Sequence, residues 1–122
     1  MRSSKQRDLV LSIINSQEEH LTAEEIYGIA KRMMPKISLG TIYRDLNQLF
    51  ESSLINRILT NDGVYKYDSN LIKHHYFICT RCGKIDDVYQ DFELPADFLP
   101  NNRIVDYDIY FKGICSDCNK EV

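Results

Sequence analysis

The chain has 122 residues and a formal net charge of −3 at pH 7, with 43% hydrophobic and 27% charged residues. This composition is typical of a soluble globular protein with one domain or two small ones. No apolar run approaches the length of a membrane span, which excludes a transmembrane protein and favours a cytoplasmic one. The charge is uneven, because residues 1–57 balance at +1 and residues 58–122 at −4. The first half can therefore approach DNA if its basic residues share one face.

Three helices are predicted in the first half, over residues 5–15, 23–34 and 39–52. Apolar residues recur in them at helical spacing, and each helix has a start signal. Thr22, with a glutamate three residues later, forms a capping box for the second helix, and Ser38 caps the third. The residues predicted to face the interior include Leu9, Ile13, Ile26, Ile29, Met33, Leu46 and Leu49. These elements predict a small helical core.

A hairpin is predicted after the third helix, with strands over residues 55–60 and 64–68 and an Asn-Asp-Gly turn between them. Three helices and a hairpin indicate a winged helix-turn-helix domain over residues 1–70, whose third helix enters the major groove of DNA. Tyr43 lies outside the apolar stripe and is expected to face DNA. The arginines are candidates for phosphate contacts and could also be solvated surface charges. The candidate DNA-binding residues are Arg7, Ser38, Thr41, Tyr43, Arg44 and Asn47.

The second half, residues 71–122, is predicted to be a small α/β domain, so that the whole chain is of the α+β class. Strands are expected over residues 75–79 and 84–89, and at most a short helix over residues 94–99. Residues 103–111 alternate between apolar and polar, which predicts a long strand with one buried face. An exposed sheet edge with aromatic residues favours dimerisation through this domain.

All four cysteines lie in two CxxC pairs, Cys79/Cys82 and Cys115/Cys118, with 32 residues between the pairs. Two such turns can supply four thiolates in a tetrahedron, which is the ligand set of a structural zinc ion. Two disulfides would suit a secreted protein, but the start of the chain is polar and does not read as a signal peptide. A redox dithiol needs only one CxxC, and iron–sulfur clusters usually have more closely spaced cysteines. We therefore expect a structural zinc site that performs no chemistry.

Several motifs together resemble the ferric-uptake-regulator family of metal-dependent bacterial repressors, and they are closest in pattern to its peroxide-responsive branch. These motifs are Gln6-Arg7, HLTAEEIY at 20–27, ISLGTIYRDL at 37–46, the cysteine block at 74–85 and GICSDC at 113–118. The resemblance covers nearly the whole chain. It implies a homodimeric winged-helix repressor that binds operator DNA and has a regulatory metal site between its two domains.

The resemblance also implies which residues form that regulatory site. In the peroxide-responsive branch three histidines and two aspartates hold Fe²⁺ or Mn²⁺. The matching positions are His20, Asp68, His74 and Asp87, and the third histidine position holds Tyr76. A neutral tyrosine is a poor ligand for a divalent ion, because the pKa of its phenol is near 10. A further metal site of some family members is not expected, since Asp106 and Tyr107 replace its histidines.

The sequence therefore predicts a DNA-binding transcriptional repressor that senses peroxide or a divalent metal and is not an enzyme. Two alternatives stay open. The chain could be a zinc-ribbon module for protein–protein contacts, or a family member with a decayed sensing site that binds DNA without metal control. Duplex binding that weakens steeply with salt separates the first alternative from the repressor. Cysteines inert to mild alkylation would exclude a small redox enzyme.

Overall fold

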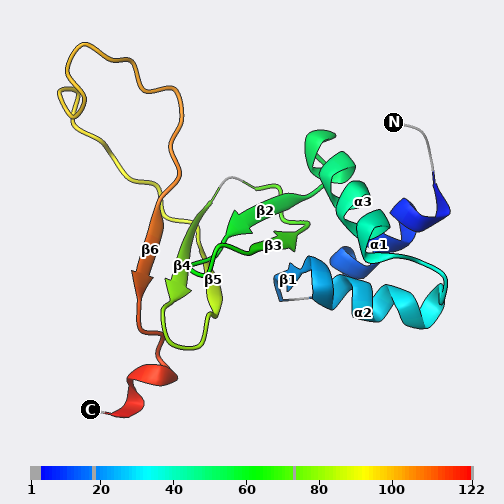
Figure 1. Cartoon of the computed structure of the whole chain (residues 1–122). Helices are drawn as coiled ribbons and strands as arrows, with labels where there is room; N and C mark the ends of the chain where they lie inside the picture. Colours follow the sequence, from blue (N-terminus) through cyan, green and yellow to red (C-terminus); the bar gives the residue numbers. More distant parts are fainter. Residues whose placement is uncertain (1–3, 18, 73, 122) are drawn as a thin grey trace. The chain divides into compact units, whose positions relative to one another are not determined.

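The computed structural model describes residues 4–17, 19–72 and 74–121, and it divides into two compact units, residues 1–71 and 72–122 (Figure 1). The helices α1 to α3 all belong to the first unit, and the second unit is built on a small sheet. Within the described residues, no helix has both the length and the apolar character that a bilayer crossing requires.

Three helices form the body of the first unit: α1 (Lys5–Ser16), α2 (Ala23–Met33) and α3 (Leu39–Glu51). Each begins where a side-chain oxygen accepts a hydrogen bond from a backbone N–H that has no partner within the helix. The N-cap residues are Ser4, Thr22 and Ser38. The predicted capping box is present, with Thr22 Oγ1 3.1 Å from the Glu25 nitrogen and Glu25 Oε1 3.0 Å from the Thr22 nitrogen.

A three-stranded antiparallel sheet completes the first unit, in the order β1-β3-β2. The predicted hairpin consists of β2 (Asn56–Leu59) and β3 (Tyr65–Asp68), and Gly63 in its turn has a φ of 79°. The third strand, β1 (Leu21–Thr22), has only two residues and was not predicted. Helices α1 to α3 followed by this hairpin form a winged helix.

The core of the first unit lies between the three helices and β3. Its buried side chains are Val10, Ile13, Ile14, Leu21, Ala23, Ile26, Ala30, Ile37, Ile42, Leu46, Leu49, Ile55 and Tyr67. Leu9 and Ile29 are only partly buried against this core. The prediction for Met33 was wrong, because its side chain is 67% exposed at the last residue of α2. A helix end extends beyond the body that the rest of the helix packs on, so periodicity alone overestimates burial there.

The second unit contains a three-stranded sheet in the order β5-β4-β6, made of β4 (His75–Cys79), β5 (Ile85–Val88) and β6 (Tyr110–Gly113). Strands β4 and β5 form a hairpin, whereas β4 and β6 are parallel. A short 3₁₀ helix, η1 (Cys118–Glu121), ends the described chain.

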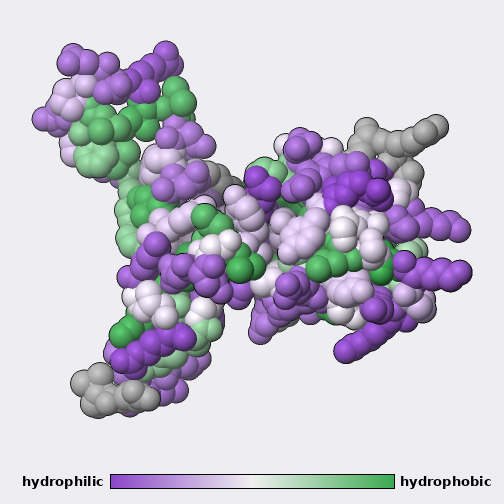
Figure 2. Space-filling view, in the orientation of Figure 1, coloured by the Kyte–Doolittle hydropathy of each residue, from purple (hydrophilic) through white to green (hydrophobic). Residues whose placement is uncertain are grey.

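The segment between β5 and β6 differs from the prediction. Residues 103–109 are not a strand, although their side chains alternate. Residues 94–99 contain a turn and a bend and no helix, which is compatible with the prediction of at most a short helix. The segment exposes apolar side chains, including Phe98 at 56%, Leu99 at 48% and Val105 at 85% (Figure 2). Alternation shows only that a segment can form a strand, and here only residues 110–113 find a partner strand.

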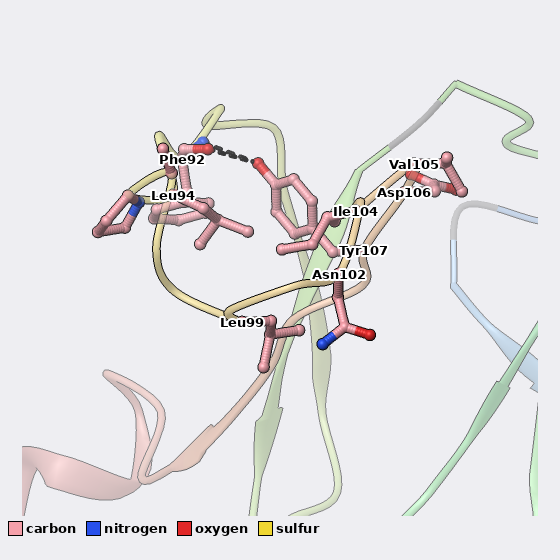
Figure 3. Close-up of a pocket in the computed structure, with 10 residues that line it drawn as sticks. Phe92, Leu94, Leu99, Asn102, Ile104, Val105, Asp106 and Tyr107 are labelled. Atoms are coloured by element: carbon pink, nitrogen blue, oxygen red, sulfur yellow. Dashed lines mark hydrogen bonds between the residues drawn. The ribbon is translucent and has the colours of Figure 1, made fainter.

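Tyr107 closes this segment into a loop. Its hydroxyl donates to the Phe92 carbonyl oxygen at 2.7 Å and accepts from the Phe92 N–H at 3.1 Å (Figure 3). The loop forms a solvent-open pocket of about 390 Å³, and Leu94, Leu99 and Ile104 are among the residues that line it. His75 reaches the loop from β4, because its ring stacks on Tyr107 at 5.1 Å.

Candidate metal centres

The four cysteines are brought together by the parallel pairing of β4 with β6. Cys79 is the last residue of β4 and lies opposite Gly113, the last residue of β6. The Thr80 N–H donates to the Gly113 carbonyl oxygen at 2.8 Å and holds the two strand ends together. Both CxxC turns therefore begin at the same end of the sheet. Gly83 allows the first turn to close, since its φ of 78° favours glycine.

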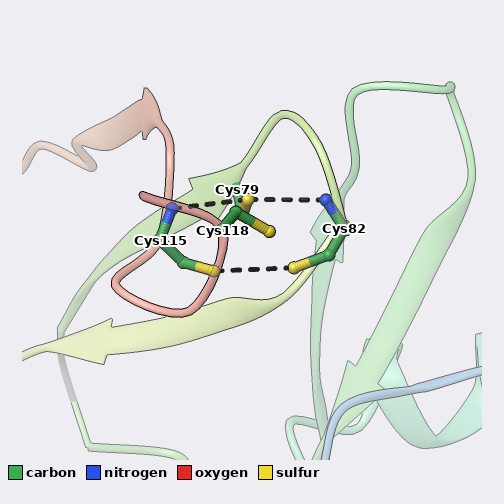
Figure 4. A group of neighbouring side chains, drawn as sticks. All are labelled: Cys79, Cys82, Cys115 and Cys118. Atoms are coloured by element: carbon green, nitrogen blue, oxygen red, sulfur yellow. Dashed lines mark hydrogen bonds between the residues drawn. The ribbon is translucent and has the colours of Figure 1, made fainter. Parts of the chain in front are cut away.

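The four sulfur atoms converge, with every pair within 4.8 Å (Figure 4). The Cys82 and Cys115 sulfur atoms are 3.7 Å apart. Zinc–sulfur bonds of about 2.3 Å in a tetrahedron place neighbouring sulfur atoms roughly 3.8 Å apart. The cluster therefore has the dimensions and the all-sulfur donor set that fit a structural zinc ion.

Backbone hydrogen bonds and neighbouring thiols shift the pKa values of the cluster in opposite directions. The backbone N–H groups of Arg81, Cys82 and Cys115 each donate to the Cys79 sulfur at 3.4 Å, and such bonds lower the pKa of Cys79 to about 6. In contrast, the thiol of Cys115 and those of the other cysteines raise the pKa of Cys118 to about 12. Four thiolates so close together repel one another, so a bound cation is what allows all four to ionise.

His20 and Asp68 form a pair within the first unit. The unpredicted strand β1 is the reason: Leu21 pairs with Tyr67 on β3, so the preceding residue His20 lies beside the following residue Asp68. His20 Nε2 is 3.3 Å from Asp68 Oδ2, and the two side chains are only 8% and 18% exposed. The adjacent His20 imidazole lowers the pKa of Asp68, which favours its charged carboxylate.

His74 and Asp87 form a second pair, within the second unit. The β4–β5 register sets Tyr76 opposite Asp87, and His74 comes just before β4. His74 Nε2 is 2.9 Å from Asp87 Oδ1, and His74 Nδ1 is 2.5 Å from the Ile72 carbonyl oxygen. The imidazole is nearly enclosed, with 1% of its side chain exposed.

Both ring nitrogens of His74 thus face atoms that only accept hydrogen bonds. A neutral imidazole has one N–H and can satisfy only one of these two contacts. Both contacts are favourable in two arrangements. In one, the ring is protonated and donates from both nitrogens. In the other, Nδ1–H donates to the carbonyl oxygen while Nε2 and the Asp87 carboxylate bind the same metal ion. The second arrangement is the usual one for metal-binding histidines, whose other nitrogen donates to a carbonyl or carboxylate.

Tyr76 lies on the same face of β4 as His74. It is 4% exposed, and its ring contacts the ring of His74 edge-on at 4.5 Å. His75 lies on the other face, where its Nδ1 accepts a hydrogen bond from the Ile109 N–H at 3.1 Å. His75 is therefore engaged with the β5–β6 segment and does not replace the histidine that Tyr76 displaces.

The predicted DNA-binding residues occupy two kinds of environment. Tyr43 is 44% exposed, the Arg44 side chain is 63% exposed, and Asn47 is exposed on α3. Ser38 and Thr41 bond to each other at the start of this helix, at 2.9 Å between hydroxyl oxygens. Arg7 is buried instead.

Arg7 is only 7% exposed and donates from Nη1 to Gln48 Oε1 at 2.8 Å, which joins α1 to α3. This internal contact favours a structural role, and its predicted phosphate contact stays a prediction. Asp45, which the sequence did not single out, is 2% exposed on α3.

Apart from the cysteines, neither unit by itself brings three or more metal-ligand side chains together within the described residues.

Comparison with known proteins shows which family has this fold and these motifs. The model of the ferric uptake regulator family matches residues 1–98. The chain belongs to the ferric uptake regulator family. Its relatives include the ferric uptake regulation protein of Bacillus subtilis, 33% identical over 115 residues that cover 88% of this chain and 77% of the relative. They also include the peroxide-responsive repressor of Staphylococcus epidermidis, 27% identical over 125 residues that cover 99% and 83% of the two chains.

Solved structures of the ferric uptake regulator family share the fold. The regulator of Helicobacter pylori, described as having three functional metal-binding sites, aligns with a TM-score of 0.80 at 25% identity over 97% of this chain and 82% of that chain. The peroxide stress regulator of Campylobacter jejuni aligns with a TM-score of 0.70 at 29% identity over 93% and 88%. The predicted fold and family are therefore confirmed.

Proposed function

We propose that this chain is a homodimeric transcriptional repressor whose winged helix binds operator DNA when a divalent metal ion occupies a regulatory site. The environment of His74 is the main support for this proposal. Its Nδ1 contacts a carbonyl oxygen, so a metal ion bound by Nε2 and the Asp87 carboxylate would give each nitrogen of the buried ring a favourable partner. A repressor acts on DNA, so we propose a cytoplasmic location.

We propose that the two histidine–aspartate pairs, His20 with Asp68 and His74 with Asp87, bind one ion together. Each pair supplies one imidazole nitrogen and carboxylate oxygen atoms, which is too few ligands for Fe²⁺ or Mn²⁺ from either pair alone. This mixed nitrogen and oxygen set suits those two ions. Because the pairs belong to different units, a shared ion would fix the angle between the units and hence the spacing of the two α3 helices in a dimer.

We propose a separate, structural role for zinc in the four-cysteine cluster. A site closed by four sulfur ligands stabilises a fold and leaves no position open for substrate. For dimerisation we propose the second unit, because the β5–β6 segment exposes Phe98, Leu99 and Val105, and an interface with a second copy would cover such apolar surface.

A matched pair of variants on β5 tests the regulatory site. Asp87→Asn removes a proposed ligand, whereas Asp86→Asn alters the neighbouring carboxylate, which is exposed and forms a surface ion pair with Lys84 at 3.8 Å. The probe is a duplex that the wild-type protein selects from a random pool in the presence of Mn²⁺. We expect Asp87→Asn to raise the Mn²⁺ concentration needed for binding roughly a hundredfold, and Asp86→Asn to leave it unchanged.

Duplex binding that ignores Mn²⁺ in the wild type would contradict metal control and support the decayed-site alternative. The signal is tested in the same system with Fe²⁺ and hydrogen peroxide. Oxidation of His20 or His74, detected by mass spectrometry together with loss of DNA binding, supports peroxide sensing. Release of DNA by chelators but not by peroxide supports sensing of the metal itself.

A further inference from the structure

Arg57 on β2 contacts aromatic rings from two other elements of the winged helix. Its guanidinium carbon is 4.0 Å from the ring centroid of Phe50, in the last turn of α3, and 4.4 Å from that of Tyr65, on β3. Both distances are well inside the range of about 6 Å at which a cation is attracted to an aromatic ring. One side chain therefore connects α3 to both strands of the hairpin.

The local fold explains both contacts. Arg57 pairs with Tyr67 and Leu59 with Tyr65, so Tyr65 is the diagonal neighbour of Arg57 on the same face of the hairpin. Phe50 is brought close by the tight turn after α3, in which Ser53 has a φ of 60° and the Leu54 N–H donates to the Leu49 carbonyl oxygen at 3.0 Å. This turn returns the chain toward β2 next to the helix end.

The outer part of the hairpin is more exposed than its base. Ile58 and Tyr67 anchor its base, with 0% and 3% exposure, whereas Leu59 and Val64 near the turn are 45% and 43% exposed. Arg57 is partly buried at this base, opposite Tyr67, and its side chain contacts Tyr65, which lies nearer the turn and is 39% exposed. Because the Arg57 guanidinium contacts both Tyr65, toward the turn, and Phe50 on α3, it links the outer half of the hairpin to the helix and limits the angle between them.

We propose that Arg57 is a positioning residue that holds the β2–β3 hairpin at a fixed angle to α3, so that both elements meet one DNA duplex together. This inference rests on the proposed DNA-binding function for its consequence, but not for the contact itself. A guanidinium can stack its planar face on a ring, whereas a lysine ammonium is a compact point charge. The role therefore depends on the shape of the side chain as well as on its charge.

The competing role for Arg57 is a direct phosphate contact, and three variants separate the two. Arg57→Lys keeps the positive charge but loses the planar group. Tyr65→Leu removes one ring and leaves the arginine intact. Tyr65→Phe is the matched control, because it keeps the ring and removes only the hydroxyl group.

In the free protein, hydrogen exchange of the hairpin amides reports the positioning. We expect Arg57→Lys and Tyr65→Leu to speed exchange of the Thr60 amide, which donates to the Val64 carbonyl oxygen, while amides within α3 and the Tyr65→Phe variant stay as in the wild type. Unchanged hairpin exchange in both variants would overturn the inference. This readout needs no DNA and is independent of the proposed function.

Affinity for the selected duplex gives the second readout. We expect Arg57→Lys and Tyr65→Leu each to weaken binding roughly tenfold, and the double variant to be no weaker than either single one. A phosphate contact instead predicts near wild-type affinity for Tyr65→Leu, or additive losses in the double variant, and either result would overturn the inference. If the wild type selects no duplex, the proposed function fails, and the exchange experiment still decides whether Arg57 holds the hairpin.

Discussion

Replacement of Cys82 by serine removes one sulfur ligand from a cluster on which the second unit depends. Among the described residues of that unit, the buried hydrophobic side chains are Tyr76, Ile78, Cys79 and Cys115, two of which are themselves cluster cysteines. The first unit, in contrast, has a core of thirteen buried side chains. A unit with so small a core needs an additional constraint to fold, and a structural metal supplies it.

The size of the effect follows from the number of ligands. Structural zinc binding contributes about 10–16 kcal/mol in small zinc domains, which is about 3 kcal/mol for each of four ligands. Loss of one sulfur should therefore weaken zinc binding by roughly two orders of magnitude. Ser116→Ala is the control, because it changes a residue of the second CxxC turn that carries no ligand atom.

Three signals from the same sample measure the effect. Competition with a chromophoric chelator measures zinc affinity. Far-ultraviolet circular dichroism measures helix content and so reports whether the first unit is folded, since α1 to α3 all belong to it. We expect Cys82→Ser to lose its zinc to the chelator at a concentration that leaves the wild type loaded, and with the zinc the near-ultraviolet signal of the tyrosines in the second unit, while the helical signal persists. Unchanged zinc affinity, or a helical signal that disappears together with zinc, would refute this reasoning.

Three further predictions concern single side chains. Thr22→Ala removes the capping box and should cost about 1 kcal/mol, which lowers the melting temperature of the first unit by about 4–8 °C in a thermal scan. Burial raises the pKa of Asp45 above its usual value of 3.8, although the positive charges of Arg44 and Arg7 oppose this rise. The ionised carboxylate therefore destabilises the folded state at pH values above the raised pKa, and this penalty disappears at low pH, where the carboxyl group is protonated. Asp45→Asn should therefore stabilise the protein at pH 7 by on the order of 1 kcal/mol and have no effect near pH 3, and melting curves at both values check this. Tyr76→His adds a nitrogen ligand beside His74 and should tighten Mn²⁺ binding roughly tenfold by calorimetry, whereas an unchanged affinity would mean that this position does not face the ion.

Local signals in the sequence predicted the helical unit well. The capping residues Thr22 and Ser38 begin their helices as expected, because a cap is a local interaction between a side chain and a backbone three residues away. The hairpin was predicted for the same reason, since its turn residues require particular backbone angles. The cysteine spacing predicted a cluster whose sulfur atoms the structure does bring together.

Features that depend on distant partners could not be predicted in the same way. Strand β1 has only two residues and exists because Leu21 and Thr22 pair with β3, yet it is what sets His20 beside Asp68. The alternation of residues 103–111 gave no information about which of them would find a partner strand. The burial of Arg7 against Gln48 likewise depends on how α1 packs on α3, which the sequence of α1 alone does not contain.

The metal content of the purified protein tests the central claim most directly, with the wild type measured beside His74→Ala. We predict one zinc ion per chain in both proteins, and a second divalent ion, added as Mn²⁺ or Fe²⁺, that the wild type retains and His74→Ala loses. Duplex binding should follow the second ion and not the zinc. One zinc ion and no second ion in the wild type, with DNA binding indifferent to added metal, would contradict the account.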